Sequence, residues 1–381
     1  MTDVTLRSAS LHFVRVTHKT CWTFLRLHSE DGRTGEGEAT LIGQEDSLVL
    51  QANRLVPVAL SEASTQDPGA FARRHASDNI RQASIISAID QALWSLHAQM
   101  NGQSLAQTLG VERDRIPVYA NINRRTESRT PEGFAASAQN AIAAGHVAFK
   151  IAPFDEVTPR ACAQGEGLRA MQVGLSRVAA VRKVVGPRAR LMIDCHWRFD
   201  EATASALNEA AAKLGVYWIE TPMVEVEDNI AALARLRRQC NSLGMRQAGL
   251  ETSVGWNTIR PYCEADAYDV VMPDMKYIGG LHEMQRTVEA CASLGVLVSP
   301  HNPSGPICHA ASLQVSAVLT AFDMLELQFD ESPLFDQLVS GPFAPIIDGY
   351  TKLPAGQGIG AVLSEAVIAN HADRPVREWR G

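Results

Sequence analysis

The sequence predicts an α/β protein in two parts: an N-terminal α+β domain followed by a closed barrel of parallel strands. Two observations lead to this prediction. In the first hundred or so residues, strands that resemble hairpins come before a long amphipathic helix. From Ile116 onwards, short β-rich runs alternate with helical segments, about eight strands with seven helices between them. Such a count within roughly 230 residues favours a closed barrel over an open doubly wound sheet.

The N-terminal α+β domain is expected to span residues 1–115. Apolar and polar side chains alternate in Leu11–Val16 and in Trp22–Leu27, which is typical of antiparallel strands. Between Ile85 and Leu96 apolar residues recur at helical spacing, and this pattern predicts an amphipathic helix over residues 78–100.

The predicted barrel spans residues 116–344, and its strands are short apolar runs. These runs are Ile116–Ala120, Val147–Ile151, Leu191–Cys195, Tyr217–Glu220, Ala248–Thr252, Val270–Met272, Leu297–Ser299 and Met324–Leu327. A tail rich in proline and glycine follows the last run, and we expect residues 345–381 to return to the first domain.

The composition indicates a globular protein whose partners are small molecules. Of the 381 residues, 46% are apolar and 20% are charged, which excludes a disordered chain. The net charge of −7 argues against nucleic acid or an anionic membrane as the main partner. The seven cysteines are scattered and never form a CxxC pair, and the N-terminus lacks an apolar signal segment. We therefore expect a cytoplasmic protein.

Three consecutive predicted strands end in a carboxylate, namely Asp194, Glu220 and Glu251. One such residue alone could simply be a loop or N-cap residue. In a barrel, however, neighbouring strands lie about 4.8 Å apart, so three carboxylates on successive strands can converge on one point. They would repel one another without a ligand. Because the set is all oxygen, with no cysteine or paired histidine, we expect Mg²⁺ in preference to zinc.

Further chemistry-bearing side chains stand at other strand ends. His196 lies two residues beyond the first carboxylate, so regular strand alternation would point it into the same cavity. Lys150, on the second strand, needs an anionic partner inside a barrel mouth. On the sixth and seventh strands, Asp274 and His301 could pair through a hydrogen bond, which makes the histidine a candidate general base. The eighth strand adds Glu326 to the rim.

Together these strand ends resemble the enolase superfamily, specifically its mandelate racemase subgroup. Asp194, Glu220 and Glu251 fall where that family places its three Mg²⁺ ligands. The resemblance implies a modified TIM barrel of the (β/α)7β type, and a capping domain whose mobile loop closes over the substrate. The run Gly35–Ala39 looks like part of that capping domain. The resemblance also implies a homo-oligomer, since relatives commonly assemble as octamers.

The resemblance implies roles for individual residues as well. Asp274 and His301 match the family's Asp-His dyad, and Glu326 matches an acid that donates to the substrate carboxylate as it becomes an enediolate. Mandelate racemase has a Lys-x-Lys pair on the second strand, whereas here Ala152 follows Lys150 at that spacing, which disfavours a racemase with two bases.

Weaker candidates for substrate contact lie near the mouth or the capping domain. They are Asn121, Asn123, Arg124, Trp22, His18 and Lys276. The first three follow the first strand, where solvated loop residues are nearly as good an interpretation. Trp22 and His18 belong to the expected capping loop. The lysine faces the cavity only if the sixth strand continues regularly.

A histidine two residues after the first metal ligand resembles the acid-sugar dehydratases of the subgroup, such as D-galactonate dehydratase. We therefore expect an Mg²⁺-dependent dehydratase of an aldonate or aldarate. His301 would remove the proton α to the carboxylate, and Mg²⁺, Lys150 and Glu326 would stabilise the enediolate. His196 would assist departure of the β-hydroxyl, giving a 2-keto-3-deoxy acid. The alternatives are an epimerase or racemase that uses Lys150 or Lys276 as second base, and a non-catalytic relative that kept the metal site.

Overall fold

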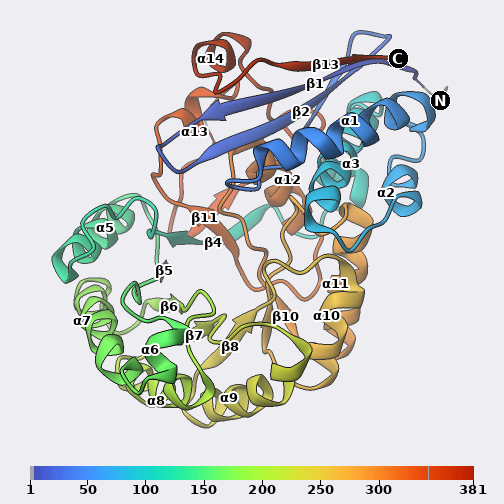
Figure 1. The fold of residues 1–381 in the computed structure, drawn as a ribbon. Helices are drawn as coiled ribbons and strands as arrows, with labels where there is room; N and C mark the ends of the chain where they lie inside the picture. Colours follow the sequence, from blue (N-terminus) through green and yellow to red (C-terminus); the bar gives the residue numbers. More distant parts are fainter. Residues whose placement is uncertain (1–3, 342) are drawn as a thin grey trace.

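The computed structural model describes residues 4–341 and 343–381. Residues 1–3, which begin the predicted first domain, and Pro342, near the end of the predicted barrel, lie outside the described residues. Helices surround a curved parallel sheet, and a smaller α+β domain packs against it (Figure 1). The predicted fold class is confirmed.

Eight parallel strands form the barrel, and they neighbour one another in chain order, with β11 beside β4. They are β4 (Arg115–Asn121), β5 (Ala148–Ile151), β6 (Arg190–Asp194), β7 (Trp218–Glu220), β8 (Arg246–Gly249), β9 (Val270–Val271), β10 (Leu297–Val298) and β11 (Leu325–Gln328). Backbone hydrogen bonds close the circle between β10 and β11, for example from the Asp323 N–H to the Val298 carbonyl oxygen (2.9 Å). Because all eight strands are parallel, their carboxyl ends meet at one mouth.

A helix connects each barrel strand to the next, which gives the (β/α)7β arrangement. These helices are α5 (Pro131–Ala143), α7 (Gly167–Val185), α8 (Glu201–Lys213), α9 (Ile230–Ser242), α10 (Gly255–Glu264), α11 (Leu281–Ser293) and α12 (Pro306–Ser316). The short helix α6 (Pro159–Ala163) precedes α7, and a 3₁₀ turn, η1 (Glu227–Asn229), precedes α9. Helix starts follow local sequence signals: the Asp200 carboxylate, for instance, accepts the Thr203 N–H (2.8 Å) at the start of α8.

The capping domain combines an antiparallel sheet with four helices. Its elements are β1 (Leu6–Arg15), β2 (Cys21–Ser29), β3 (Thr34–Glu38), α1 (Glu45–Glu62), α2 (Ala70–Arg74), α3 (Ile80–Met100) and α4 (Leu105–Leu109). The helix α3 is the one expected over residues 78–100. It lies so close to β3 that a Cβ atom on Gly37 would stand 2.0 Å from the Ala88 carbonyl oxygen. Glycine at this position is therefore required by the close approach of strand and helix.

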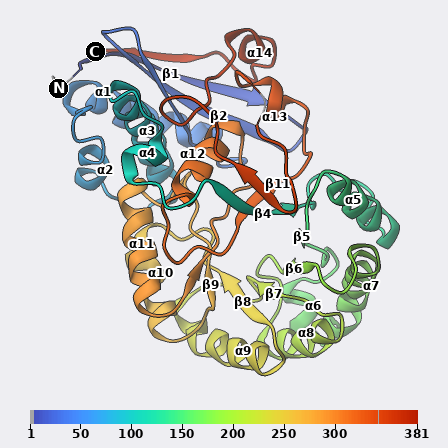
Figure 2. The same cartoon turned by 180° about the vertical axis from the view of Figure 1, so that it is seen from behind.

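The tail after the barrel touches both domains. After α13 (Leu334–Gln337), β12 (Tyr350–Lys352) pairs antiparallel with β4, so this part of the tail lies against the barrel. After α14 (Glu365–Asn370), β13 (Arg377–Arg380) pairs antiparallel with β1 in the capping sheet. Strands β1 and β13, which are far apart in the sequence, consequently lie side by side (Figure 2).

Two buried carboxylates of the capping domain hold the starts of barrel helices. Glu38, on β3, accepts the N–H groups of Gly305 (2.7 Å) and Cys308 (2.9 Å) at the start of α12. Asp90, on α3, accepts the Leu281 N–H (2.6 Å) at the start of α11. These helices follow the loops that carry Asp274 and His301, so the capping domain helps to fix that side of the mouth.

All seven cysteines are free and buried. Among the helices of the described residues, none is both long enough and apolar enough to cross a membrane.

Candidate metal and catalytic site

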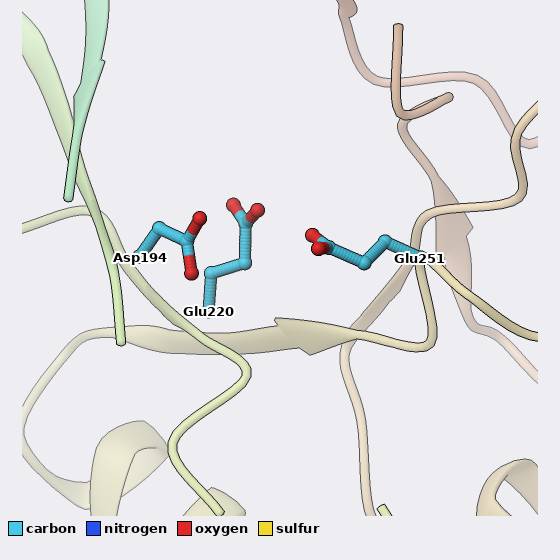
Figure 3. Close-up of side chains that lie close together, drawn as sticks. All are labelled: Asp194, Glu220 and Glu251. Atoms are coloured by element: carbon cyan, nitrogen blue, oxygen red, sulfur yellow. The ribbon is translucent and has the colours of Figure 1, made fainter. Parts of the chain in front are cut away.

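Three buried carboxylates meet at the barrel mouth. Asp194 and Glu220 are the last residues of β6 and β7, and Glu251 follows the end of β8. One carboxylate oxygen of each lies within 4.8 Å of the others. The carboxylates of Asp194 and Glu220 stand side by side, and Glu251 points at them from the opposite side (Figure 3). The sequence expectation that these three side chains converge is met by this geometry.

The charge of Glu251 is less well compensated by protein groups than the charges of Asp194 and Glu220. Burial raises the pKa of Glu220 to about 7. Burial, with the charges of Asp194 and Glu220, raises the pKa of Glu251 well above its ordinary value. The Oε2 atom of Glu251 has no hydrogen-bond partner within the described residues. A cluster of convergent carboxylate oxygens with an unpartnered buried member fits a hard divalent cation.

Lys150 links the metal-site carboxylates to Glu326. Its Nζ lies 2.6 Å from Glu220 Oε1 and 2.9 Å from Glu326 Oε1. Glu326 also accepts the Asn121 side-chain amide (2.6 Å) and the Asn302 N–H (3.2 Å). Burial acts to raise the pKa of Glu326, but Lys150, His301 and the Asn121 amide lower it below its ordinary value. The proton-donating role that the resemblance implies for Glu326 stays a prediction.

His301 is oriented by a buried aspartate. Its Nδ1 lies 2.7 Å from Asp274 Oδ2, which leaves Nε2 directed towards Glu251 Oε2 at 3.8 Å. Burial lowers the pKa of His301 and so favours the neutral imidazole that a base requires. Lys276 does not lie on a regular strand, because β9 ends at Val271. Its Nζ binds the same Asp274 oxygen at 2.6 Å.

His196 reaches the metal site by a different route from the one expected. Strand β6 ends at Asp194, and His196 has a left-handed backbone with φ +48°, so strand alternation does not place it. The turn nonetheless brings its Nε2 to 2.7 Å from Asp194 Oδ2, and the Asp194 charge raises the pKa of His196. Its side chain is 39% exposed, so it is accessible from the mouth.

Only one of the weaker candidates near the first strand and in the capping loop belongs to the site. Asn121 belongs to the site through its bond to Glu326. Asn123 and Arg124 instead bind neighbouring loop residues, Arg129 (2.8 Å) and Glu331 (3.1 Å) respectively. His18 lies in the exposed loop between β1 and β2.

Trp22 is a correction to the sequence analysis. It is not on the loop but on β2, where it is 1% exposed. Its ring packs edge-on against Phe24 and Phe335, with centroid distances of 6.3 and 6.0 Å. Strand β2 is buried along nearly its whole length, so the ring belongs to the hydrophobic core.

Several residues of the site were not anticipated. The Trp218 Nε1 donates to Glu220 Oε2 (3.0 Å), and the Tyr277 hydroxyl lies 3.2 Å from His301 Nδ1. Trp218 stands two positions before Glu220, so strand alternation would have indicated it. Glu225 accepts hydrogen bonds from Trp197, Leu250 and Tyr268 in three loops around the metal site. No local pattern in the sequence predicts these contacts.

The comparisons with known proteins identify the family. The model described as Enolase C-terminal domain-like matches residues 133–367, and the Mandelate racemase / muconate lactonizing enzyme N-terminal domain matches residues 2–110. The chain therefore belongs to the enolase superfamily, in its mandelate racemase and muconate lactonizing enzyme branch.

Similar proteins carry more than one activity. The D-gluconate dehydratase of Thermoproteus tenax is 29% identical over 92% of this chain and 70% of that protein. The D-galactarolactone cycloisomerase of Agrobacterium fabrum is 26% identical over 96% of this chain and 94% of that protein. The crystal structure of mandelate racemase/muconate lactonizing enzyme from Jannaschia sp. CCS1 superposes with a TM-score of 0.86 at 21% identity, covering 98% of this chain and 99% of that one. That likeness shows the fold.

Proposed function

We propose that this protein is a cytoplasmic, Mg²⁺-dependent dehydratase of an acid sugar, either an aldonate or an aldarate. The observation that carries the proposal is the juxtaposition of the carboxylate triad with the Asp274–His301 pair: His301 Nε2 lies 3.8 Å from Glu251 Oε2. A cation site and a base that face the same point suit removal of a proton next to a carboxylate.

In the proposed reaction, His301 Nε2 takes the proton α to the substrate carboxylate. The electron pair of that C–H bond moves towards the carboxylate and forms an enediolate. Asp274 holds the imidazole through Nδ1, so that Nε2 is the accepting atom. Asp194, Glu220 and Glu251 would hold a bound Mg²⁺. The cation would supply positive charge that stabilises the negative charge on the substrate carboxylate. Lys150 contributes a second positive charge at the same place.

The β-hydroxyl then leaves as water when the electron pair returns and the C–O bond breaks. His196, which is accessible from the mouth, would donate the required proton. The enol that results tautomerises to a 2-keto-3-deoxy acid. The relative named D-gluconate dehydratase supports this class of substrate.

Epimerisation requires a second base, and the structure does not favour one. The two lysines considered for that role are both held in ion pairs: Lys150 by Glu220 and Glu326, and Lys276 by Asp274. Against the effect of burial, the Glu220 and Glu326 charges raise the pKa of Lys150, so this amine keeps its proton.

The test is incubation of the purified protein with Mg²⁺ in D₂O against a panel of aldonic and aldaric acids. We expect 2-keto acid from one or a few stereoisomers. Deuterium at the α-carbon without loss of water would replace dehydration by epimerisation, and silence with every acid would contradict the proposal.

The His301→Asn variant tests the assigned base. We expect kcat to fall by about 10²–10⁴-fold, because a positioned general base contributes a factor of that size. The matched control is His282→Asn on the exposed face of α11, which should retain full activity. A folded His301→Asn variant with undiminished dehydration would show that another group is the base.

A further inference from the structure

One carboxylate outside the triad ties together the loops that carry the metal-site residues. Glu225 lies in the loop after β7, and its Oε2 accepts the Trp197 indole N–H (2.9 Å) from the loop after β6. Its Oε1 accepts both the Tyr268 hydroxyl (2.7 Å) and the Leu250 backbone N–H (2.7 Å). Leu250 immediately precedes Glu251. The carboxylate thus connects the surroundings of all three converging side chains.

The loops that it joins have unusual backbone conformations. Leu250 has φ +70°, and left-handed values also occur at Thr221 (φ +42°), next to Glu220, and at Trp197 (φ +57°). Leucine avoids this region because its Cβ approaches the backbone too closely. Such a conformation persists only where surrounding contacts impose it. At Leu250, the hydrogen bond from its own N–H to Glu225 is such a contact.

The contact between Glu225 and the end of β8 is close. A Cβ atom on Gly249 would lie 2.4 Å from Glu225 Oε1 and 2.6 Å from the Tyr268 ring. Any side chain at position 249 would therefore push the carboxylate away from the Leu250 N–H. The absence of a side chain at this glycine lets the carboxylate reach the backbone that turns Glu251 towards the barrel axis.

We infer that Glu225 is a positioning residue for the divalent-cation site. By fixing Leu250 in its left-handed conformation it directs Glu251 at Asp194 and Glu220, and it makes no contact with the reacting atoms. The inference rests on the proposed cation site, but it concerns a residue that supplies no ligand atom to it. The relevant measurement is therefore cation affinity, and catalysis does not enter.

The experiment is a direct Mn²⁺ titration of the full chain, followed by the electron paramagnetic resonance of free Mn²⁺. We expect Glu225→Ala to weaken Mn²⁺ binding at least tenfold. The matched control is Glu227→Ala, an exposed glutamate two residues further along the same loop, which should bind as the wild type does. Glu225→Gln has the same size and keeps one acceptor, so it should fold even if the alanine variant does not, and its affinity should be intermediate.

A second change separates positioning from a general loss of stability. Glycine adopts φ +70° without the steric cost that leucine has, so Leu250→Gly in the Glu225→Ala or Glu225→Gln background should restore most of the Mn²⁺ affinity. Thermal unfolding without cation establishes that each variant is folded. If folded Glu225 variants bind Mn²⁺ like the wild type, or if Leu250→Gly restores nothing, the positioning role is wrong. If the wild type itself binds no Mn²⁺, it is the proposed cation site that fails.

Discussion

The charges around Lys150 differ in how well they are compensated. The lysine is shared between Glu220 and Glu326, and each of these carboxylates has a further donor, Trp218 or Asn121. Glu251, by contrast, has an oxygen with no hydrogen-bond partner in the described part of the chain. Buried ions that lose a partner destabilise a fold strongly, whereas added counter-charge stabilises it. The stability of the protein should therefore fall when the Lys150 charge is removed and rise when a divalent cation is added.

Replacing Lys150 by methionine should destabilise the protein when divalent cations are absent. The change leaves Glu220 and Glu326 buried without their shared positive charge, so the free energy of unfolding should fall by about 3–5 kcal/mol. Urea unfolding in EDTA measures the loss. Lys183→Met, at an exposed position on α7, is the control and should have little effect. Equal stability of the two variants would mean that the ion pairs of Lys150 are unimportant for folding.

Adding a divalent cation, which supplies positive charge where Lys150→Met removes it, should stabilise the native state. At a free Mg²⁺ concentration 100 times Kd, the free energy of unfolding should rise by about 2.7 kcal/mol, because the cation binds the folded chain and not the unfolded one. Calorimetric melting with and without EDTA measures this difference. Glu251→Gln removes one charged ligand and should abolish most of the rise. A melting temperature that is indifferent to Mg²⁺ in the wild type would contradict the assignment of these carboxylates.

At the scale of elements, the capping domain contributes to the site through two barrel helices. Asp90 on α3 caps α11, and Glu38 on β3 caps α12, so the helices behind Asp274 and His301 are both held by buried acids from another domain. Such caps satisfy backbone N–H groups that would otherwise be buried without partners. One of them should also leave a signature in the pH dependence of stability.

Burial raises the pKa of Asp90 to about 7, whereas an unfolded aspartate titrates near about 3.9. Between these values the folded protein keeps a proton that the unfolded chain releases, so the free energy of unfolding falls as the pH rises. Asp90→Asn keeps an acceptor for the Leu281 N–H and cannot ionise. We expect it to exceed the wild type in stability at about pH 8, by an amount on the order of a few kcal/mol, and to match it near about pH 4.

Urea unfolding across this pH range measures the difference. Asp78→Asn, at an exposed position just before α3, is the control and should follow the wild type at every pH. If the free energy of unfolding depends on pH in the same way for Asp90→Asn and the wild type, the Asp90 carboxylate has the same pKa in the folded and unfolded states.

The elements were largely predictable from sequence, and the side-chain contacts between them were not. The helix α3 and the alternation of barrel strands and helices follow from apolar periodicity, which is a local property of the chain. The triad was predictable because strand ends in a parallel barrel must meet. His196 and Leu250 depart from regular geometry through left-handed turns, and no pattern of residue types reports such a turn when the residue is not glycine. Trp22 was placed at the boundary between the predicted strand Trp22–Leu27 and the expected capping loop, whereas β2 begins one residue earlier, at Cys21.

At the scale of the whole molecule, the capping sheet is assembled from both ends of the chain. Strand β13 pairs with β1 from Ser8 opposite Arg380 to Leu11 opposite Arg377, and Trp379 packs on the capping core. Without β13, the outer edge of β1 would present unpaired backbone groups, which promote association between chains.

A chain that ends at Arg374 should therefore keep its barrel and lose stability in the capping sheet. We expect a lower melting temperature and concentration-dependent self-association in size-exclusion chromatography with light scattering. Mn²⁺ affinity should persist, because the triad lies on β6, on β7 and in the loop just after β8. Trp379→Ala in the full chain is the comparison. This variant keeps the backbone pairing of β13 with β1, so it should self-associate no more than the wild type does. An unchanged melting temperature for the shortened chain would contradict this view of β13.

The pairing of β1 with β13 also fixes an order of events during synthesis. The ribosome delivers the chain from its N-terminus, and domains generally fold as units while they emerge. Each barrel strand after β4 lies beside the barrel strand made just before it, and only the pairing of β11 with β4 joins barrel strands made far apart in time. The capping sheet, although it begins first, must keep the edge of β1 open until residues 377–380 have been made. Strand β1 is thus completed only after every barrel strand has been made, and the growing chain carries an exposed sheet edge while the barrel is being synthesised.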